Sequence, residues 1–491
     1  MKIRELLSEI RVLSSSGSKD QLVKLLLTDS RRVVPGSIFF AVSGSKTSGC
    51  QYINEAIERG AIAIISESNQ RPIDPILFVQ VEDVRHALAK MAQLFYGSPD
   101  QSISITGVTG TNGKSTVAQL LQFYFRKQSK KCGLLGTIEY DLGDRTLPAH
   151  RTTPESVDIF SMLAEMIKSD CKEAVMEVSS HGIDQKRIAN MEFDTAIFTN
   201  LTQDHLDYHA NMENYFQAKC RLFDGSNGTS IKKAVVNIDD PYGLRLSKII
   251  PREVKVITFG THESANLKIS NINLSSEECN FNLSLDDREV RIKSPLLGKY
   301  NVSNVVAALA VLYLKGDSLE EFQEELLGFS GVPGRMERIP NSLGYTILVD
   351  YAHTPDALKN ALSMLRDIIS GKIILVFGCG GNRDRSKRPE MLKIALVYAN
   401  FIFLTSDNPR SEKIDNIFQD MLIGNDPSES TYFVKDREKA IRRALKVANP
   451  GDCLLVAGKG HETYQEYADT IVPFDDRKVI IKLLQKECLS L

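Results

Sequence analysis

The stretch GVTGTNGKST, residues 107–116, follows a short β-type run, ISITGV, and precedes a helical pattern, STVAQLLQFYFRKQ. A glycine-rich turn between a strand and a helix offers backbone N–H groups to an anion, and the N-terminus of the helix favours negative charge. Lys114 suits phosphate oxygens, and Ser115 or Thr116 suits Mg²⁺. A tight turn with a surface lysine is the alternative. We therefore predict a phosphate-binding loop inside an α/β domain.

The spacing of this loop departs from the general phosphate-loop pattern, G-x-x-x-x-G-K-[ST]. That pattern requires a glycine where Val108 stands, and Gly107 comes one position too early. We expect Val108 to pack as a strand residue. The residue types thus predict phosphate binding, whereas the spacing does not name the class of protein.

Length and composition limit the remaining interpretations. A chain of 491 residues is too long for one ordinary core and predicts about three domains. Its 60 basic and 62 acidic residues give a net charge of −2, which does not favour a nucleic-acid partner. No apolar run is long enough for a membrane span, and the first residues, MKIRELLSEIR, predict an amphipathic helix rather than a signal peptide. We expect a cytoplasmic protein whose scattered cysteines are mostly buried free thiols.

Short apolar runs alternate with helical patterns along most of the chain, which favours α/β domains with largely parallel sheets. Residues 1–98 contain predicted strands at 37–44, 61–66 and 76–81, with helices near 52–60 and 85–97. Residues 99–333 begin within a linker at 98–101 and contain predicted strands at 173–180, 195–201 and 233–240. Polar and apolar residues alternate between about 254 and 292, which suggests an antiparallel addition.

A glycine- and proline-containing hinge, residues 331–339, spans the start of the third segment, 334–491, and precedes its run of strands. Four apolar runs there end in polar or glycine-rich residues: YTILVDYAHTP, GKIILVFGCGG, NFIFLTSDNP and DCLLVAGKGHE. Ligands of open α/β sheets gather at the carboxyl ends of strands, so these endings predict one crevice. The expected architecture is a smaller N-terminal α/β domain, a central P-loop-type ATPase domain with a mostly parallel sheet, and a C-terminal Rossmann-like domain.

Acidic and imidazole side chains follow two predicted strands of the central segment. Glu177 lies in MEVSSH, and FTNLTQDHLDYH supplies Asp204, His205, Asp207 and His209. A carboxylate and an imidazole beside a phosphate loop suit Mg²⁺ on a nucleotide. Two alternatives remain open for His205 and His209: a pair on a solvated helix face, or a zinc site.

Taken together, these motifs resemble the Mur ligase family over essentially the whole chain. GTNGKST, MEVSSHG, TNLTQDHLDYH, YFQAKCRLF, GKYNVSNVVAALA and VDYAHTPDAL occur in the family's order, and the loop spacing at 110–115 is the family's own. The resemblance implies a three-domain, ATP-dependent amide ligase of peptidoglycan precursor synthesis, with Mg²⁺ as cofactor. It implies catalytic roles for Lys114, Glu177, His205 and Lys219, and metal ligation by Ser115, Glu177, His205 and carbamylated Lys219. The implied ATP-binding residues are Gly110, Thr111, Asn112, Gly113, Lys114, Ser115, Thr116, Asn304, Arg335 and Asp350.

Lys219 in YFQAKCRLF would ordinarily be read as a solvated helical lysine. It matches the lysine that the family carbamylates, and the conversion makes chemical sense because a metal requires an anionic oxygen where an ammonium would repel it. The residue pattern alone leaves the solvated side chain open.

The resemblance also implies where the UDP-sugar dipeptide, UDP-MurNAc-L-Ala-D-Glu, binds. The implied contacts are Thr28, Ser30, Ser45, Lys46, Thr47, Thr152, Thr153, Ser179, Gln185 and Arg187. An arginine suits the carboxylates of the peptide because its planar fork donates two hydrogen bonds at once. Relatives often end the first-domain loop with a different triplet followed by D-G, whereas Ser48 precedes Gly49 in this chain.

SDNPRSE, residues 406–412, resembles the signature of family members that add meso-diaminopimelate rather than L-lysine. Diaminopimelate has a distal carboxylate that requires a cation and a distal ammonium that requires an anion, and Arg410 and Glu462 offer these charges. A lysine substrate would leave a buried arginine unpaired. A simple proline turn is the alternative for D-N-P-R alone. The implied diaminopimelate-binding residues are Arg383, Asp407, Asn408, Pro409, Arg410, Gly458 and Glu462.

Three other functions compete with this interpretation. A related ligase, such as a folylpolyglutamate synthase or the ligase that adds D-alanyl-D-alanine, would not require the T-D-S-R and D-N-P-R patterns. A P-loop switch or motor would use only residues 107–116. A regulatory protein without catalysis would show altered Lys114, Glu177 or His205, and these residues are intact. We expect a monomeric enzyme acting on ATP, UDP-MurNAc-L-Ala-D-Glu and meso-diaminopimelate, with neither nucleic acid nor membrane as partner.

Overall fold

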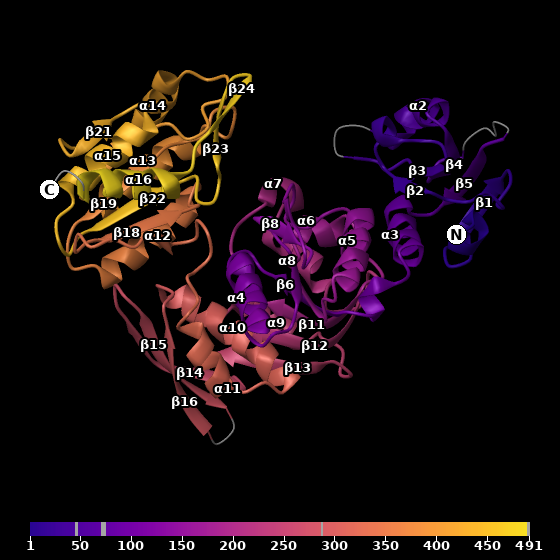
Figure 1. The fold of residues 1–491 in the computed structure, drawn as a ribbon, viewed down its shortest axis with the longest axis horizontal. Helices are drawn as coiled ribbons and strands as arrows, with labels where there is room; N and C mark the ends of the chain where they lie inside the picture. The colour runs from indigo at the N-terminus through magenta and orange to yellow at the C-terminus, as the bar shows by residue number, and fades with distance from the viewer. Residues whose placement is uncertain (45–47, 70–74, 286–287, 489–491) are drawn as a thin grey trace. The chain divides into compact units, whose positions relative to one another are not determined.

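The computed structural model describes residues 1–44, 48–69, 75–285 and 288–488, and the side chains of all of these up to residue 485. The chain divides into two compact units (Figure 1): Met1–Lys268 with Ser303–Leu319, and Ile269–Val302 with Glu320–Leu491. Within the described residues, no helix has the length and apolar character to cross a bilayer. The cysteines whose side chains are described are free thiols, and all of them except the partly exposed Cys50 are buried, as expected.

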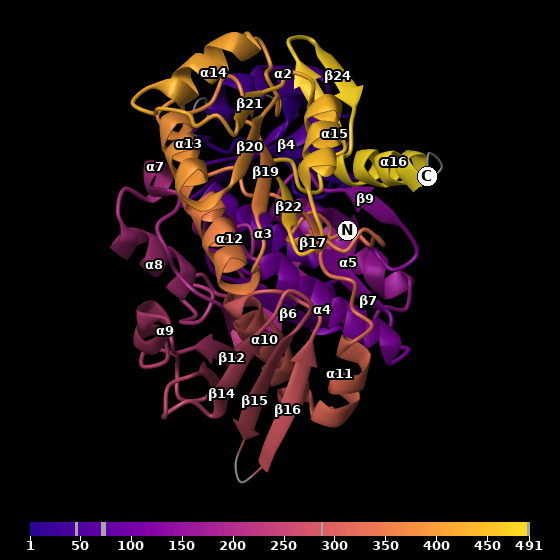
Figure 2. The same ribbon diagram turned by 90° about the vertical axis from the view of Figure 1, so that its left-hand side faces the viewer.

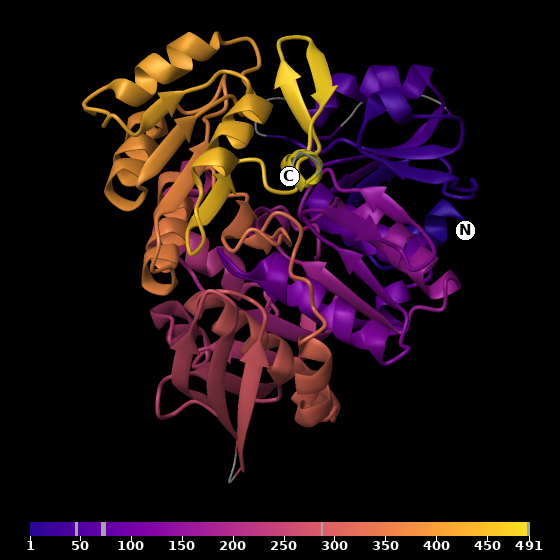
Figure 3. The same ribbon diagram turned by 60° about the vertical axis from the view of Figure 1, so that its left-hand side comes forward.

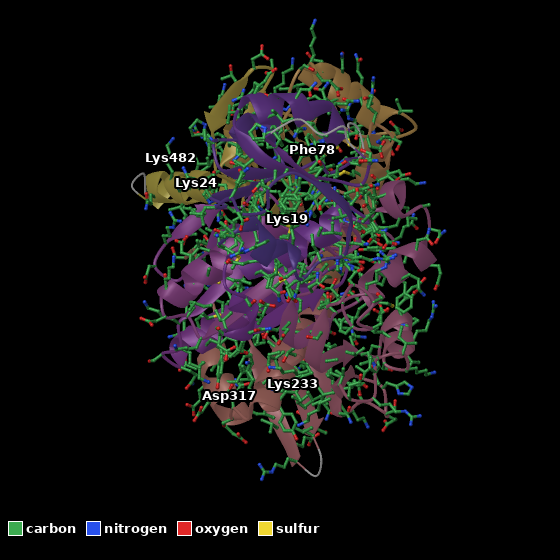
Figure 4. The ribbon with its side chains drawn as sticks, turned by 90° about the vertical axis from the view of Figure 1, so that its right-hand side faces the viewer. Lys19, Lys24, Phe78, Lys233, Asp317 and Lys482 are labelled. Atoms are coloured by element: carbon green, nitrogen blue, oxygen red, sulfur yellow. The ribbon has the colours of Figure 1, made fainter. Side chains whose placement is uncertain are left out.

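The first unit begins with a five-stranded sheet in the order β1-β5-β4-β3-β2. Its strands are β1 (Val12–Ser16), β2 (Leu25–Leu27), β3 (Ser37–Phe40), β4 (Ala61–Ser66) and β5 (Leu77–Val81), and only β1 is antiparallel to its neighbour. Leu77 and Val79 face the larger core of this unit, whereas Phe78, labelled in Figure 4, faces a smaller core with Phe39. The period-two alternation of a strand explains this division.

One helix of this segment differs in length from the sequence expectation, and two agree with it. Helix α1 (Ile3–Leu7) is shorter than the amphipathic helix expected for the first residues. Helices α2 (Ile53–Glu58) and α3 (Val84–Phe95) confirm the two predicted later in the segment. The predicted linker forms a short helical turn, Pro99–Gln101.

The rest of the first unit is built on a second, mostly parallel sheet. Its strands follow the order β13-β12-β11-β6-β10-β7-β8-β9, where β6 (Ser104–Thr109) lies between β10 (Glu173–Glu177) and β11 (Glu192–Phe198). All three are parallel, and their pairing aligns Glu177 with Val108 and Phe198 with Thr109. The loops that carry the predicted nucleotide chemistry therefore leave neighbouring strand ends. The other strands are β7 (Cys132–Leu135), β8 (Glu139–Asp141), β9 (Thr146–Pro148), β12 (Ser230–Asn237) and β13 (Lys255–Gly260).

The helices of this region confirm the predicted alternation. Helix α4 (Lys114–Lys127) follows the glycine-rich loop, and α8 (Met212–Cys220) carries Lys219. The remaining helices are α5 (Ser156–Lys168), α6 (Ser180–Asp184), α7 (Leu206–His209), α9 (Pro241–Leu246) and most of α10 (Lys299–Lys315), whereas α11 (Leu319–Leu326) belongs almost wholly to the second unit.

The antiparallel addition expected between about 254 and 292 is only partly correct. Strand β13 runs parallel to β12, and β14 (Leu267–Leu274) begins parallel to β13. Only β15 (Cys279–Leu285) and β16 (Arg288–Ser294) pair as an antiparallel hairpin. Alternation of polar and apolar residues reports one solvated face of a strand, and it does not fix the direction of the neighbouring strand.

The second unit contains a six-stranded sheet in the order β17-β18-β22-β19-β20-β21. Every pair is parallel except the one between β17 (Glu337–Arg338) and β18 (Thr346–Asp350). The others are β19 (Ile373–Phe377), β20 (Phe401–Leu404), β21 (Thr431–Phe433) and β22 (Cys453–Ala457). The four strands predicted to end at one crevice, β18, β22, β19 and β20, are neighbours, which confirms that expectation.

Helices cover both faces of this sheet (Figure 2). Helices α12 (Pro355–Ile368), α13 (Lys387–Tyr398) and α14 (Ile414–Leu422) pack on one face, and α15 (Arg437–Val447) and α16 (Asp476–Cys488) pack on the other. A separate hairpin of β23 (Tyr464–Tyr467) and β24 (Thr470–Pro473) stands apart from the six-stranded sheet, drawn in yellow in Figure 3. The α/β prediction with largely parallel sheets is confirmed.

Candidate active site

The glycine-rich loop is held against the end of strand β11. Thr111 N–H donates to the carbonyl of Asn200 at 2.9 Å, and Asn112 N–H donates to Asn200 Oδ1 at 2.9 Å. Thr199 Oγ1 donates to the carbonyl of Asn112 at 2.6 Å. Thr199 and Asn200 were not among the predicted site residues, although their place in the T-N-L-T stretch after a buried strand was a usable signal. The loop is thus fixed by side chains from outside its own motif.

The conformation of the loop explains its glycines. Gly110 has φ +149° and Gly113 has φ +87°, and a Cβ on Gly110 would lie 1.9 Å from Thr199 Oγ1. Gly113 lies against Asn304 of α10, which is buried. Val108 is fully buried in β6, which confirms that it is a packing residue. The loop therefore keeps its backbone open to an anion.

Lys114 and Lys219 converge on the carbonyl oxygen of Gly110. Lys114 Nζ donates to it at 2.9 Å and to the carbonyl of Thr111 at 2.8 Å. Lys219 Nζ donates to it at 3.1 Å, is 1% exposed, and lies 4.8 Å from the centroid of the Tyr215 ring. The alternative of a solvated Lys219 is therefore wrong.

Burial strongly affects the charge on Lys219. It lowers the pKa of the Lys219 ammonium well below its usual value; the nearby Lys114 lowers it further, whereas Asp204 opposes the shift. A lowered pKa favours the neutral amine, which is the form that can react with an electrophile such as CO₂. The structure thus places a lysine of altered acidity beside the loop.

Glu177 lies at the centre of a group of hydroxyls next to the loop. Its Oε2 accepts hydrogen bonds from Ser115 Oγ and from Thr137 Oγ1, each at 2.9 Å, and its Oε1 accepts from Thr137 N–H at 2.9 Å. A buried carboxylate beside a serine hydroxyl is a donor set that suits Mg²⁺. Thr137, which follows β7, was not predicted from the sequence.

The same hydroxyl group continues toward the predicted peptide site. Thr137 Oγ1 lies 3.1 Å from Thr152 Oγ1, while Thr153 Oγ1 donates to the carbonyl of Glu177 at 2.9 Å and accepts from Ser179 N–H at 2.9 Å. Ser179 also caps α6. The structure therefore joins the phosphate loop to Thr152, Thr153 and Ser179 through Glu177 and Thr137.

Arg187 extends this group toward a cluster of arginines. Its guanidinium donates to the carbonyl of Thr153 at 2.6 Å and to Gln185 Oε1 at 2.7 Å, and Nε lies 3.3 Å from Glu155. Glu155 also pairs with Arg151, and Arg85 of α3 lies 3.9 Å from it. Burial lowers the pKa of Arg187, although Glu155 opposes this. Three arginines share the Glu155 carboxylate, so this site suits an anion. Arg85, Arg151 and Glu155 were not predicted from the sequence.

His205 lies beside Asp204 and packs against His181. It caps α7 with φ +53°, its Nε2 lies 3.5 Å from Asp204, and its ring packs edge-on against His181 at 4.8 Å. Burial lowers the pKa of His205, Asp204 opposes this shift, and Lys114 adds to it, so the neutral imidazole is favoured. Within the described part of the chain, no three His, Cys, Asp or Glu side chains are grouped to hold a metal, so the zinc alternative has no support.

His209 lies on the buried side of α7 rather than on a solvated face. It is buried, its Nε2 lies 3.0 Å from Ser180 Oγ, and its ring stacks on Tyr215 at 5.1 Å. The alternative of two histidines on a solvated face therefore fails for His209, whereas His205 is about half exposed.

The N-terminal residues predicted to contact the sugar nucleotide are only partly described. Thr28 is exposed after β2, and buried Ser30 donates from Oγ to Glu55 at 2.7 Å. Ser45, Lys46 and Thr47 lie outside the described residues. Ser48, which follows them, accepts the Cys50 N–H at the start of a short helical turn.

The predicted nucleotide contacts of the second unit lie around Tyr351. The Arg335 guanidinium stacks over the Tyr351 ring at 4.8 Å, and His461 packs against that ring at 5.0 Å. Asp350 ends β18 and accepts from Met336 N–H at 2.7 Å and from Ala352 N–H at 2.8 Å. Burial raises the pKa of Asp350, and Arg335 opposes the rise.

The residues predicted to bind diaminopimelate come together at the ends of β19, β20 and β22. A Cβ on Gly380 would lie 3.2 Å from Arg410 Nη1 and 3.6 Å from the Arg383 side chain. Gly458, with φ +109°, leaves room for Asp407, whose Oδ2 is buried and has no hydrogen-bond partner among the described residues. Pro409 lies beside Gly381, where its carbonyl leaves no room for a Cβ.

A second charged pair lies in the same site. Glu462 Oε2 accepts from Asn408 Nδ2 at 2.9 Å and from fully buried Lys459 Nζ at 2.9 Å. Lys459 also donates to Asn408 Oδ1 at 3.1 Å. The site therefore presents cations and carboxylates to a zwitterionic ligand. Lys459, in G-K-G-H-E, was not among the predicted site residues.

Three family models match successive segments of this chain. They are the Mur ligase family, catalytic domain, at residues 22–96, the Mur ligase middle domain at 108–312, and the Mur ligase, glutamate ligase domain, at 334–460.

Curated relatives match over nearly the full length. The UDP-N-acetylmuramoyl-L-alanyl-D-glutamate--2,6-diaminopimelate ligase of Solibacter usitatus is 42% identical over 489 residues, covering 99% of this chain and 98% of the relative. The ligase of the same name from Geobacillus thermodenitrificans is 41% identical and covers 98% of each chain.

A solved structure supports the same relationship. A UDP-N-acetylmuramoyl-L-alanyl-D-glutamate--2,6-diaminopimelate ligase structure is similar with a TM-score of 0.71 at 33% identity, and the match covers 99% of each chain. Full-length similarity, together with a glycine-rich loop joined to a buried carboxylate and an arginine cluster, leads to one conclusion: this chain belongs to the Mur ligase family and is a ligase.

Proposed function

We propose that this ligase adds meso-2,6-diaminopimelate to the D-glutamate of UDP-MurNAc-L-Ala-D-Glu, with conversion of ATP to ADP and phosphate. The product is the UDP-MurNAc-tripeptide of peptidoglycan synthesis. The relatives named above carry this activity in their names and match over nearly the whole chain. Domains of 1–98, 99–333 and 334–491 would divide the binding of the UDP-sugar, of ATP and of the amino acid.

One observation carries the reaction type: the hydroxyl network from Ser115 through Glu177 and Thr137 to Thr152. Amide formation from a carboxylate is uphill in water, so the carboxylate must first become an acyl phosphate. This network connects the loop that would hold the γ-phosphate to the side chains that would hold the D-glutamyl carboxylate. Phosphoryl transfer depends chiefly on such positioning and on stabilisation of developing charge.

The charged side chains have distinct roles in this step. Lys114 and the N-terminus of α4 would balance charge on the transferred phosphoryl group, and Arg187 would orient the acceptor carboxylate. Attack by the amino group of diaminopimelate on the acyl phosphate then gives a tetrahedral intermediate, which expels phosphate. Mg²⁺ would supply charge stabilisation to the phosphate oxygens, and Ser115, Glu177 and His205 fit it as oxygen and nitrogen donors.

Lys219 fits this proposal only in a modified form. A neutral amine is favoured at this buried position, and carbamylation would convert it into an anionic oxygen donor beside the loop. Without the modification, two lysines at one carbonyl would repel a metal ion. The amount of bound CO₂, measured on the intact protein by mass spectrometry under bicarbonate, tests this modification independently of turnover.

Amino-acid choice rests on the paired charges of the second unit. Arg410 and Arg383 flank Gly380. Glu462 and Asp407 would supply the opposite charge, and Asp407 Oδ2 has no hydrogen-bond partner within the described part of the chain. A distal carboxylate and ammonium would find complementary partners there, whereas lysine offers only the ammonium. We therefore propose meso-diaminopimelate as the substrate. We also propose a monomer as the active form.

Phosphate release measured with purified protein tests the proposal. The protein receives ATP, Mg²⁺ and UDP-MurNAc-L-Ala-D-Glu with either meso-diaminopimelate or L-lysine. We expect turnover with diaminopimelate and little with lysine. Faster turnover with lysine would refute the amino-acid assignment, and phosphate release independent of both amino acids would refute the ligase reaction proposed for this chain.

Arg410→Ala provides the matched variant. Loss of the cation should raise KM for diaminopimelate by about tenfold or more, because a charge-assisted hydrogen bond is worth about 1.5–3 kcal/mol, and KM for ATP should stay unchanged. Equal increases for both substrates would make Arg410 a structural residue.

A further inference from the structure

Strand β23 runs along the D-N-P-R loop and fixes its backbone. Arg410 N–H donates to the carbonyl of Glu466 at 2.9 Å, and Ala468 N–H donates to the carbonyl of Arg410 at 2.7 Å. Arg410 has φ +53°, a left-handed conformation that is unusual for a residue with a side chain. Two backbone hydrogen bonds with Glu466 and Ala468 therefore hold the D-N-P-R loop at the residue that has the left-handed conformation.

Side chains of the same strand hold the rest of the loop. Buried Gln465 donates from Nε2 to the carbonyl of Asp407 at 2.8 Å and to Ser406 Oγ at 3.1 Å. Glu466 N–H donates to Asn408 Oδ1 at 3.0 Å. Gln465 and Glu466 of β23 therefore hydrogen-bond to successive residues of the loop 406–410, and the hairpin fixes the conformation of this loop.

The guanidinium of Arg410 is held at two of its nitrogens. Nε lies 2.8 Å from Glu466 Oε2, and Nη1 donates to the carbonyl of Gly381 at 2.9 Å. A guanidinium has five N–H donors in a rigid plane, so fixing Nε and Nη1 fixes the direction of the others. The Glu466 carboxylate is the contact that a substitution can remove without altering the backbone.

A purely stabilising role explains this contact less well. The side chains of Arg410 and Glu466 are 21% and 33% exposed, and partly exposed ion pairs contribute about 0–1 kcal/mol to stability. A carboxylate beside an arginine weakens that arginine's net attraction for a second carboxylate at any orientation, so a benefit of this contact to ligand binding comes from the direction of the remaining N–H donors. Selection of a planar ligand depends more on orientation than on net charge.

We propose that Glu466 is a positioning residue, which orients Arg410 through β23 so that the chain selects an amino acid with a distal carboxylate over lysine. The inference rests on the proposed function, in which Arg410 binds the distal carboxylate of diaminopimelate. Glu466 does not touch the substrate in this role. It acts only through the plane of the Arg410 guanidinium.

The test compares Glu466→Ala and Glu466→Gln with a matched control, Glu438→Ala. Glu438 of α15 pairs with Arg442 at 3.0 Å and lies 3.8 Å from Lys482 in the same unit, and its side chain is about as exposed as that of Glu466. Steady-state KM and kcat are measured for diaminopimelate, lysine and ATP in the full-length enzyme, and thermal unfolding is recorded for each variant.

Glu466→Ala should raise KM for diaminopimelate about tenfold, equivalent to ~1.4 kcal/mol, because Arg410 loses its fixed plane. The kcat, KM for ATP and kcat/KM for lysine should remain within about twofold, since lysine has no carboxylate for Arg410 to bind. Glu466→Gln should recover most of the loss because its amide oxygen still accepts from Nε. Glu438→Ala should leave every kinetic constant unchanged.

Two results would overturn the inference: an unchanged or lower KM for diaminopimelate in Glu466→Ala, or equal increases in KM for diaminopimelate and ATP. A failure of the proposed function looks different, because the unmodified enzyme would itself prefer lysine or show no dependence on an amino acid. Wild-type preference for diaminopimelate with an unaffected Glu466→Ala variant would refute only the role of Glu466.

Discussion

The pair of Arg437 and Asp476 gives a sharp prediction about stability. Both side chains are fully buried, with Nε 2.7 Å from Oδ1 and Nη2 2.7 Å from Oδ2. Arg437 also donates to the carbonyls of Ser406 and Ala457, at 3.3 and 2.9 Å. These carbonyls lie just past the end of β20 and at the end of β22, the strands that lead to the proposed diaminopimelate residues.

Asp476→Ala should destabilise the protein by about 3–5 kcal/mol, because it leaves an arginine buried without a counter-charge. In a unit of this size about 2–4 °C of Tm corresponds to each kcal/mol, so the unfolding transition that reports on this unit should fall by about 10 °C. Calorimetry of the full chain measures this shift, and urea titration followed by circular dichroism gives the free energy. Glu438→Ala, an exposed-pair control, should change stability by less than about 1 kcal/mol.

The double variant Arg437→Met/Asp476→Leu separates loss of charge from loss of packing. Replacing both partners with apolar side chains removes the unpaired charge, so its stability should be much closer to the wild-type value than that of Asp476→Ala. A Tm for Asp476→Ala within the range of the Glu438→Ala control would refute the reasoning. So would a double variant as unstable as the single one.

The remaining predictions concern pH and the phosphate loop. Burial lowers the pKa of His461 to about 4, so the unfolded chain binds more protons than the folded chain between pH 6.5 and 4. The contribution of His461 to stability is therefore present above pH 6.5 and is lost as the pH falls toward 4. His461→Gln should therefore flatten this decrease in the free energy of unfolding, measured by urea titration at pH 7 and 5, and an unchanged pH slope would contradict it. Gly110→Ala should raise KM for ATP at least about tenfold, because a Cβ would strain the backbone by about 1–3 kcal/mol and meet Thr199 Oγ1. Nucleotide binding measured by calorimetry checks this effect separately from turnover, and wild-type affinity for ADP would show that the loop tolerates the Cβ.

The glycine-rich loop and the strand-end motifs were readable from the sequence because their chemistry is local. Of the glycines at 107, 110 and 113, for which the sequence predicts positive φ, Gly110 and Gly113 have it, whereas Gly107 lies within β6 and does not. The helix begins at Lys114, directly after the loop. The gathering of the ends of β18, β22, β19 and β20 at one edge of the sheet followed from apolar runs that end in polar residues, although the order of these strands did not. Strand direction between 254 and 292 was not readable, because alternation reports burial rather than the direction of pairing.

The partners that complete the site come from distant parts of the chain, and local patterns do not report them. Asn200, which follows strand β11, accepts a hydrogen bond from the glycine-rich loop, and Thr137 links Glu177 to Thr152. Glu466 pairs with Arg410 although it lies more than fifty residues further along the chain. The burial that alters the acidity of Lys219 is likewise a property of the assembled unit.

The sequence by itself determined the fold class, the phosphate loop and the family resemblance, because periodicity and short motifs encode local backbone geometry. Only the tertiary structure decided which side chains meet. It removed the solvated alternative for Lys219 and for His209, which are both buried. Contacts between distant residues depend on strand order and helix packing. The contacts of Thr137, Glu155 and Glu466 with the site could therefore be identified only from the tertiary structure.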